Sequence, residues 1–486
     1  MSREGQIIAE RLKKIGELKK EGINPYPNKF EKKNSIGECL KGKIGTKVKT
    51  AGRLITKREL GKIAFAKLRD ATGEIQIVFQ DEKTPEKIFS FFKKYIDAGD
   101  FAGVEGEIIK TKTGEISILV KKIELLSKAI LPLPEKWHGL QDKEERYRKR
   151  YLDLVMNPEV KKIFEAREIV IDTIRDFLKK KSFVEVETPV LQPVYGGASA
   201  TPFITHLNAL DMNLFLAISP ELYLKRLVVG GFDRIFTICK NFRNEGIDKS
   251  HNPEFTMLEF YCAYANYEEL MKMAEELIKE LFKKLKLGDS FDYQGTKLNF
   301  KTIKRMKFQE LIKDKTGIDI EKADNFDKLK KEIEKKKLRE VNIKNAKHYG
   351  ALLDELYKRV VRPNIIQPVF LTNYPVEMIA LAKRNEKNPR FINTFQLIVN
   401  GAEIIKSYDE LNDPIDQENR LIEQVKLKQK GDTEAMPMDE DFLVALKTGM
   451  PPTAGFGLGI DRLVMLLTNQ PSIRDVILFP FMKKEE

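Results

Sequence analysis

The sequence predicts an α+β protein in which a small N-terminal β-barrel precedes a larger unit built on an antiparallel sheet flanked by helices. The 486 residues suffice for two or three domains, and 42% of them are hydrophobic, enough to fill separate cores. Short alternating strands with glycine turns follow one another between residues 47 and 126. From about residue 141, longer helical patterns mix with strands.

An amphipathic helix is expected in the N-terminal extension, residues 1–45. Between residues 5 and 21, apolar residues recur at helical spacing among basic ones: Ile7, Ile8, Leu12, Ile15 and Leu18. Pro25 and Pro27 end the segment. Such a stripe normally marks a buried face, so packing on the next domain is the favoured interpretation, and contact with nucleic acid is the alternative.

Residues 46–130 predict the barrel, with strands expected at 64–68, 74–79 and 115–120. Phe65 and Lys67 share one face of the first of these strands, and Gln76 lies on the next strand. A ring, a cation and an amide therefore converge if that face is outward. By hydrophobicity alone, Phe65 belongs to the core instead.

Residues 131–150 are expected to be a linker. For Trp137 and His138, packing within this linker is favoured over a chemical role. The remaining residues, 151–486, form the larger unit, with a lysine-rich helical insertion around 301–345.

The charge balance favours a polyanionic partner. Lys and Arg number 86 against 73 Asp and Glu, which gives a net charge of +13 and a pI near 9.2. A generally lysine-rich surface explains the charge equally well. Three isolated cysteines without a Cys-x-x-Cys pair argue against a disulfide framework and a cysteine zinc site, and no leader or membrane span is evident. These features predict a protein of the reducing cytoplasm that does not enter the membrane.

Two segments carry the chemistry. Residues 241–245 and 251–261 read as strands joined by a charged loop, and Phe255, Met257, Glu259 and Tyr261 share one face of the second strand. Arg243 shares one face of the first strand with Asn241, and Arg462 follows a glycine-rich segment where an apolar helix begins. Two guanidinium groups and an aromatic ring suit a triphosphate that carries a base. The loops that most often bind phosphate, GxxxxGK[ST] and an early GxGxxG, are absent from the sequence.

These segments resemble motifs 2 and 3 of class II aminoacyl-tRNA synthetases, and the whole chain is most similar to the lysyl-tRNA synthetases of bacterial type. The matching segments are 196–200, 220–226, 251–261, 410–414 and 473–480. The resemblance implies an OB-fold that binds the anticodon, followed by a class II catalytic domain. It also implies joining of L-lysine to tRNA(Lys) through a lysyl-adenylate, with ATP as co-substrate and Mg²⁺ as cofactor. The resemblance further implies a cytoplasmic homodimer formed through residues 183–189.

The resemblance assigns roles to individual residues. The residues expected to act in catalysis are Arg243 and Arg462, and those expected to bind ATP are these two with Glu245, His251, Asn252, Phe255 and Glu403. The residues expected to bind lysine are Glu221, Glu259, Tyr261, Lys406, Tyr408 and Glu410. The residues expected to bind the anticodon are Phe65 and Gln76. Adenine is expected between Phe255 and Arg462. Arg243 is expected to bridge the α-phosphate and the substrate carboxylate, because a guanidinium offers a planar bidentate fork. His251 is assigned to binding and not to acid–base work.

Two positions depart from the family pattern, and both remove negative character. Gln396 stands where relatives carry a metal-binding glutamate, which leaves Glu403 as the clear carboxylate ligand. Lys406 stands where relatives carry asparagine, and we expect it at the carboxylate end of the substrate. Ser250 replaces an arginine that some relatives have.

Two other readings stay open at this point. An aspartyl- or asparaginyl-tRNA synthetase shares the barrel and the catalytic layout, but its pocket needs a cation at the side-chain end. A catalytically impaired tRNA-binding paralogue is suggested only by Gln396 and Lys406.

Overall fold

The chain divides into two compact units, Met1–Gln141 and Asp142–Glu486. A computed structural model describes residues 2–134, 140–344 and 346–484. The boundary falls inside the segment expected to be a linker, and helix α4 (Lys143–Arg148) at its end belongs to the second unit. Trp137 and His138 lie outside the described residues. No helix among the described residues is long and apolar enough to cross a membrane.

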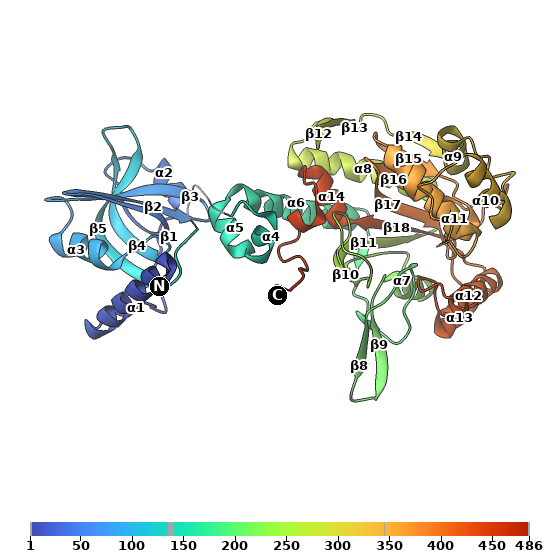
Figure 1. Cartoon of the computed structure of the whole chain (residues 1–486), viewed down its shortest axis with the longest axis horizontal. Coiled ribbons are helices and arrows are strands. Elements are labelled where there is room, and N and C mark those ends of the chain that lie inside the picture. The colour runs from blue at the N-terminus through green and yellow to red at the C-terminus, as the bar shows by residue number, and fades with distance from the viewer. Residues whose placement is uncertain (1, 135–139, 345, 485–486) are drawn as a thin grey trace. The chain divides into compact units, whose positions relative to one another are not determined.

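The first unit is a closed β-barrel (Figure 1). Its strands are β1 (Lys47–Leu60), β2 (Ile63–Asp70), β3 (Gly73–Gln80), β4 (Phe101–Lys110) and β5 (Ile116–Ser127), joined in the order β1-β2-β3-β5-β4. Alternate residues point inward, as Ala64, Ala66 and Leu68 do on β2, and they fill one core. Helices α2 (Ile36–Lys41) and α3 (Glu86–Tyr95) belong to the same unit, and Phe89 and Phe92 of α3 enter that core.

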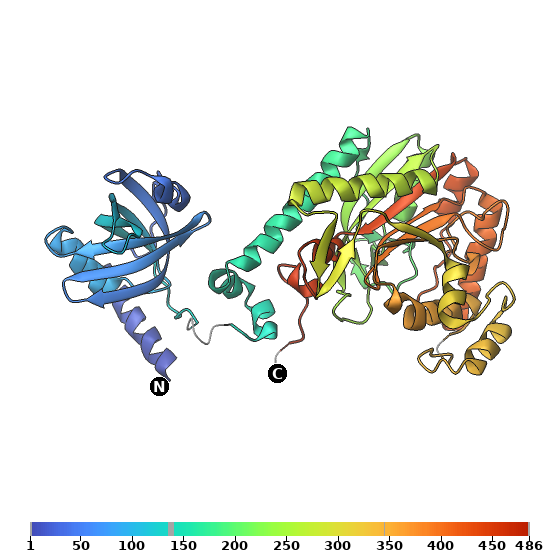
Figure 2. The same cartoon turned by 90° about the horizontal axis from the view of Figure 1, so that it is seen from above.

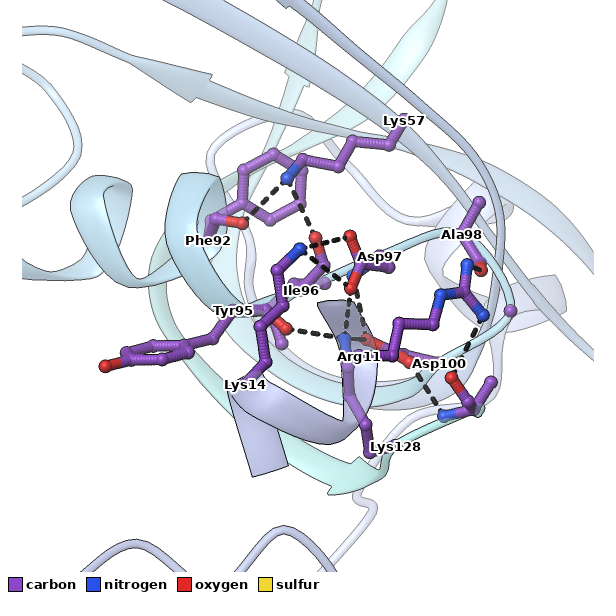
Figure 3. A network of polar contacts seen from close by, with 12 residues as sticks. Arg11, Lys14, Lys57, Phe92, Tyr95, Ile96, Asp97, Ala98, Asp100 and Lys128 are labelled. Atoms are coloured by element: carbon purple, nitrogen blue, oxygen red, sulfur yellow. Dashed lines mark hydrogen bonds and ion pairs between the residues drawn. The ribbon is translucent and has the colours of Figure 1, made fainter. Parts of the chain in front are cut away.

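Helix α1 (Arg3–Lys20) is tied to the barrel by buried polar contacts (Figure 3). The Arg11 guanidinium donates to the carbonyls of Ala98, Ala129 and Leu131 at 2.9 Å each. Lys14 pairs with Asp97 at 2.9 Å, and the buried Lys128 contacts the same carboxylate. This outcome agrees with the packing interpretation of the N-terminal helix.

The second unit is built on a central sheet of eight strands in the described part of the chain, in the order β14-β15-β16-β17-β18-β11-β10-β6 (Figure 1). The strands are β6 (Val184–Glu185), β10 (Arg234–Phe242), β11 (Glu254–Ala263), β14 (Lys304–Lys307), β15 (Val369–Thr372), β16 (Thr394–Val399), β17 (Ala402–Asp409) and β18 (Thr453–Gly459). Pairing is antiparallel except at the two edges, where β14–β15 and β6–β10 run parallel. The antiparallel sheet flanked by helices is confirmed.

Helices α6 (Glu159–Lys180), α8 (Tyr267–Leu285) and α14 (Ile460–Leu467) cover one face of this sheet (Figure 2). Their apolar residues share a core with Phe260, Phe395 and Phe456 from the strands. The sheet is therefore sealed on this side, and the functional side chains lie on the other.

The smaller elements surround this framework. They are α5 (Arg150–Met156), β7 (Leu191–Gln192), β8 (Ile204–Leu207), β9 (Met212–Leu216), α7 (Glu221–Val229), β12 (Ser290–Tyr293), β13 (Thr296–Asn299), α9 (Phe308–Thr316), α10 (Phe326–Lys335), α11 (Tyr349–Leu356), α12 (Pro414–Gln429) and α13 (Glu440–Lys447). The segment around 301–345, expected to be a helical insertion, contains α9 and α10 but also supplies the edge strand β14. It is thus continuous with the central sheet.

Candidate active site

A cavity of about 720 Å³ opens on the uncovered face of the central sheet. It brings together residues from α7, β11, β16, β17, β18, α14 and the loop that follows β10. Every residue that the sequence placed in the catalytic site lines it: Glu221, Arg243, Glu245, His251, Asn252, Phe255, Glu259, Tyr261, Gln396, Glu403, Lys406, Tyr408, Glu410 and Arg462. Segments separated by more than 200 positions in the chain thus meet at one site.

Strand register arranges these side chains in rows across the sheet. In one row, Gln396 of β16 pairs with Lys406 of β17, which pairs with Gly457 of β18, which pairs with Glu259 of β11. Because Gly457 has no side chain, it leaves an open floor between an ammonium group and a carboxylate.

The adjacent row runs from Tyr408 through Gly455 to Tyr261. A Cβ atom at Gly455 would collide with the carboxylate of Glu410 and lie 2.7 Å from Cε1 of Tyr261. Glycine is required here because the side chains of Glu410 and Tyr261 converge on the space.

Three buried carboxylates form the acidic part of the cavity: Glu221, Glu259 and Glu410. The Tyr408 hydroxyl donates to Glu221 at 2.8 Å, and the Ser219 hydroxyl donates to Glu259 at 2.9 Å. Glu221 lies in the first turn of α7, where the helix dipole favours negative charge. Neighbouring hydroxyls therefore hold Glu221 and Glu259 in place.

Lys225 completes this group and is not among the residues predicted from the sequence. Its side chain is fully buried, and its Nζ pairs with Glu221 at 2.6 Å and with Glu410. The spacing of four from Glu221 on a helix was a signal for the first pair, but the second depends on a residue 185 positions later. When all are ionised, three carboxylates and one ammonium leave two negative charges.

Burial changes the protonation of this group. Desolvation, together with the charge of Glu221, raises the pKa of Glu259 to about 8. Desolvation also raises the pKa of Glu410 well above its ordinary value, although Lys225 opposes the shift. Burial acts to lower the pKa of Lys225, but the charges of Glu221 and Glu410 outweigh it and raise the pKa. An incoming cation would therefore strongly stabilise the ionised form of the acids in this pocket.

Arg243 lies just beyond the end of β10 on the basic side of the cavity. Its guanidinium carbon lies 5.0 Å from the centroid of the Phe255 ring, and Nη2 donates weakly to the carbonyl of Ile218 at 3.5 Å. The buried Nε has no hydrogen-bond partner among the described residues. Burial lowers the pKa of this guanidinium, against the opposing charges of Glu245 and Glu259. A buried arginine with an unused donor is prepared to bind an anion.

Arg462 enters the cavity from the first turn of α14. It donates to the carbonyl of Glu403 at 3.2 Å and contacts Nε2 of His251 at 3.1 Å. The other ring nitrogen of His251 lies 2.9 Å from Asp248. In the structure Arg243 lies over the Phe255 ring. The expected position of adenine between Phe255 and Arg462 stays a prediction.

Asn252 and Glu245 are placed differently from each other. The Asn252 side chain is buried, donates to the carbonyl of Glu254 at 2.6 Å and accepts from the amide of Phe481 at 3.4 Å. Glu245 is exposed at the cavity mouth. Asn252 therefore orders the loop between β10 and β11, and Glu245 remains available to a ligand.

The expected metal ligands offer a small donor set. The buried Gln396 accepts a hydrogen bond from the Tyr374 hydroxyl at 2.7 Å, and Glu403 lies on the neighbouring strand β17. Within the described residues, no three His, Cys, Asp or Glu side chains group together in a way that would hold a metal ion. A magnesium ion at Glu403 would need most of its ligands from elsewhere, such as phosphate oxygens.

The barrel carries the other predicted residues. Phe65 is partly exposed and lies outside the barrel core, whereas its neighbours Ala64 and Ala66 are buried, so the core alternative for Phe65 is wrong. Lys67 pairs across the strands with Gln76, whose amide donates to Ser117 at 3.0 Å. The ring, the cation and the amide therefore share one outer face of β2 and β3.

Family models match both units. The model described as tRNA synthetases class II (D, K and N) matches residues 142–483, and the model described as OB-fold nucleic acid binding domain matches residues 48–126. A class II synthetase domain preceded by an anticodon-type OB-fold is therefore the class of protein that the fold and the site define.

Individual relatives narrow this class. The lysine–tRNA ligase of Carboxydothermus hydrogenoformans is 46% identical over 485 residues, covering 99% of both chains. The lysine–tRNA ligase of Fusobacterium nucleatum is 46% identical over 99% of this chain and 98% of its own. Lysine–tRNA ligase 2 of Methanosarcina mazei is 46% identical over 100% of this chain and 96% of its own. The chain belongs to the family of the lysine–tRNA ligases.

Proposed function

We propose that this enzyme joins L-lysine to tRNA(Lys) in two steps, through a lysyl-adenylate made from ATP. The observation that carries the proposal is the single cavity in which Glu221, Glu259 and Glu410 gather beside Arg243. Acids on one side suit a cationic amino acid, and guanidinium groups on the other suit its carboxylate and the nucleotide phosphates.

The charge of the acidic part matches lysine. Free lysine carries two ammonium groups at neutral pH, and the three glutamates together with Lys225 carry two negative charges once all of them are ionised, which an incoming ammonium group favours. A neutral or acidic side chain would leave a buried carboxylate unpaired, so the pocket discriminates strongly against it. An aspartate-specific site needs a cation where this site has Glu410, which disfavours that alternative.

Arg243 and Arg462 perform the electrostatic part of the first step. The substrate carboxylate attacks the α-phosphate, pyrophosphate leaves, and negative charge concentrates between the two anions. Arg243, with its unused Nε and its planar fork, is placed to hold both anions in line. Phe255 gives the base an aromatic face, while His251 and Arg462 form a contacting pair on the phosphate side. No protein nucleophile is needed.

Lysine-binding roles are completed by Tyr261, Tyr408 and Lys406. The two tyrosines wall the acidic pocket and donate to its carboxylates. Lys406 lies across Gly457 from Glu259, so a zwitterionic head group on that floor would have its carboxylate toward Lys406 and its ammonium toward Glu259. Glu403 is the protein carboxylate that suits a magnesium ion, which when bound to ATP would neutralise phosphate charge.

The first unit supplies tRNA recognition in this proposal. Phe65 presents a ring for stacking on an anticodon base, and Gln76 presents an amide that can hydrogen-bond the same base or its neighbour. The enzyme works as a homodimer through residues 183–189, which lie at the exposed β6 edge of the central sheet. Its tRNA substrate and its three free cysteines suit the cytoplasm.

ATP–pyrophosphate exchange with each of the twenty amino acids tests this proposal. Lysine should support exchange at least ~100-fold better than aspartate or asparagine, because an unpaired buried carboxylate costs about 3 kcal/mol or more. Transfer of labelled lysine to tRNA(Lys) then tests the second step. Exchange that depends on aspartate, or tRNA binding without any exchange, would refute the proposed activity.

A further inference from the structure

Lys406 is a cavity lysine whose ammonium group has no hydrogen-bond or ion-pair partner among the described residues. It is partly exposed and lies in the middle of β17, with its cross-strand neighbours Gln396 and Gly457 on either side. Lys225, by contrast, is already paired with two acids. Lys406 is therefore available to a ligand, and Lys225 is not.

Gln396 offers a donor and not a charge beside Lys406. Its Oε1 accepts from the Tyr374 hydroxyl at 2.7 Å, so the amide nitrogen is left as the end without a partner in the described chain. An amide nitrogen donates to anions and does not ligate metal ions. The pair formed by Gln396 and Lys406 thus presents an ammonium and an amide donor to the same cavity wall.

This arrangement suits an anion and disfavours a divalent cation. Arg243 and Arg462 already bring two guanidinium groups to the cavity, and Glu403 is the cavity carboxylate on β17, where it pairs with Ile398 and not with Gln396. A doubly charged cation placed beside Gln396 would meet the ammonium of Lys406 at short range in a partly buried site, where repulsion is weakly screened.

We propose that Lys406 and Gln396 form a fixed anion-binding pair that contacts the reacting carboxylate and α-phosphate and excludes a divalent cation from that end of the cavity. This inference rests on the proposed function and adds to it. Bound metal is thereby confined to the Glu403 side, and a protein ammonium stabilises charge where the two anions meet. Because Lys406 touches the reacting atoms in this scheme, it is a catalytic residue.

Ligand binding to Lys406→Gln tests the contact with the anion. We expect the variant to bind a non-hydrolysable lysyl-adenylate analogue about 10- to 100-fold more weakly, the loss typical of one charge-assisted hydrogen bond. L-Lysinol, which keeps both ammonium groups but lacks the carboxylate, should bind within about threefold of the wild type. The matched control is Lys240→Gln on β10, because Lys240 is exposed, pairs with Glu254 at 3.1 Å and does not line the cavity.

Ion counting tests the exclusion of metal. Mn²⁺ bound in the presence of an ATP analogue is counted by electron paramagnetic resonance for the wild type and for Gln396→Glu/Lys406→Gln. The double variant should bind one Mn²⁺ more per active site than the wild type. Equal counts would overturn the exclusion of metal.

Stronger lysinol binding by Lys406→Gln would mean that Lys406 shields Glu259 instead of binding an anion, and would overturn the anion contact. Lysine-dependent exchange by the wild-type enzyme separates these failures from a failure of the proposed function. If the wild type exchanges with lysine while the variants contradict the expectations, only the role of Lys406 and Gln396 is refuted.

Discussion

Replacing Lys225 by methionine should destabilise the second unit more than any surface substitution, because it leaves Glu221 and Glu410 without their shared cation. Both ion pairs of Lys225 are buried, and removal of one partner of a buried pair costs about 3–5 kcal/mol. At ~2 °C per kcal/mol for a unit of this size, the melting temperature of the full chain should fall by about 6–10 °C.

Arg226→Met is the matched control, since Arg226 is the next residue on α7 and its side chain, which pairs with Asp439 at 2.7 Å and with the exposed Asp441 at 3.1 Å, is partly exposed. It should lower stability by only about 1 kcal/mol. Calorimetry at about pH 8 and about pH 6 adds a second check. Glu410, whose pKa burial raises, takes up a proton as the pH falls, so the deficit of Lys225→Met should shrink at the lower pH.

The double variant Lys225→Met/Glu410→Gln should recover part of the loss, because it removes one of the two orphaned carboxylates. Melting of Lys225→Met within about 2 °C of Arg226→Met, or the same loss of stability at both pH values, would contradict charge compensation by Lys225. A large deficit without pH dependence would mean that Lys225 acts through packing alone.

Three further predictions concern binding and catalysis. Because the pKa of Glu259 is raised to about 8, this carboxyl is mostly protonated in the free enzyme below that pH. Lysine binding should therefore release up to one proton, and the affinity for lysine should fall up to about tenfold per pH unit below pH 8. Calorimetry in buffers of different ionisation enthalpy measures the proton release, and binding heats that do not depend on the buffer would contradict it. Gly455→Ala should have a lower melting temperature and a lower yield of folded protein, because its Cβ meets Glu410. Gly457→Ala, whose nearest contact is 3.4 Å away, should fold normally but lose lysine-dependent exchange. Equal melting temperatures for the two variants would contradict this expectation. Phe65→Ala should lower the efficiency of tRNA aminoacylation roughly 5- to 150-fold, because the loss of stacking costs about 1–3 kcal/mol per base. ATP–pyrophosphate exchange without tRNA should stay unchanged, and a comparable loss in exchange would show a structural effect instead.

The cavity is prepared for its substrate before the substrate arrives. Desolvation of Glu259 and Glu410 costs free energy in the empty enzyme, and an ammonium group that enters the pocket recovers part of it. Arg243 is in the same condition on the basic side, since its buried Nε lacks a partner in the described chain. A charged ligand therefore lowers the free energy of the buried groups on both sides of the cavity, which favours binding of the two reactants over binding of water.

The sequence by itself determined the local features. Strand alternation placed Phe255, Met257, Glu259 and Tyr261 on one face of β11, and all four line the cavity. The helical stripe of the N-terminus and the short strands of the barrel also follow from periods of 3.6 and 2 residues, which involve only near neighbours in the chain.

Only the tertiary structure decided which distant residues share a charge or a space. Lys225 acquires its role from Glu410, 185 positions away, and Lys406 faces Glu259 only because two strand pairings place Gly457 between them. Strand order and register set these distances, and both depend on the packing of the whole sheet, which no local period encodes. The pairing of β14 at the edge of the sheet and the outward position of Phe65 also depend on tertiary packing, because burial is a property of the assembled fold.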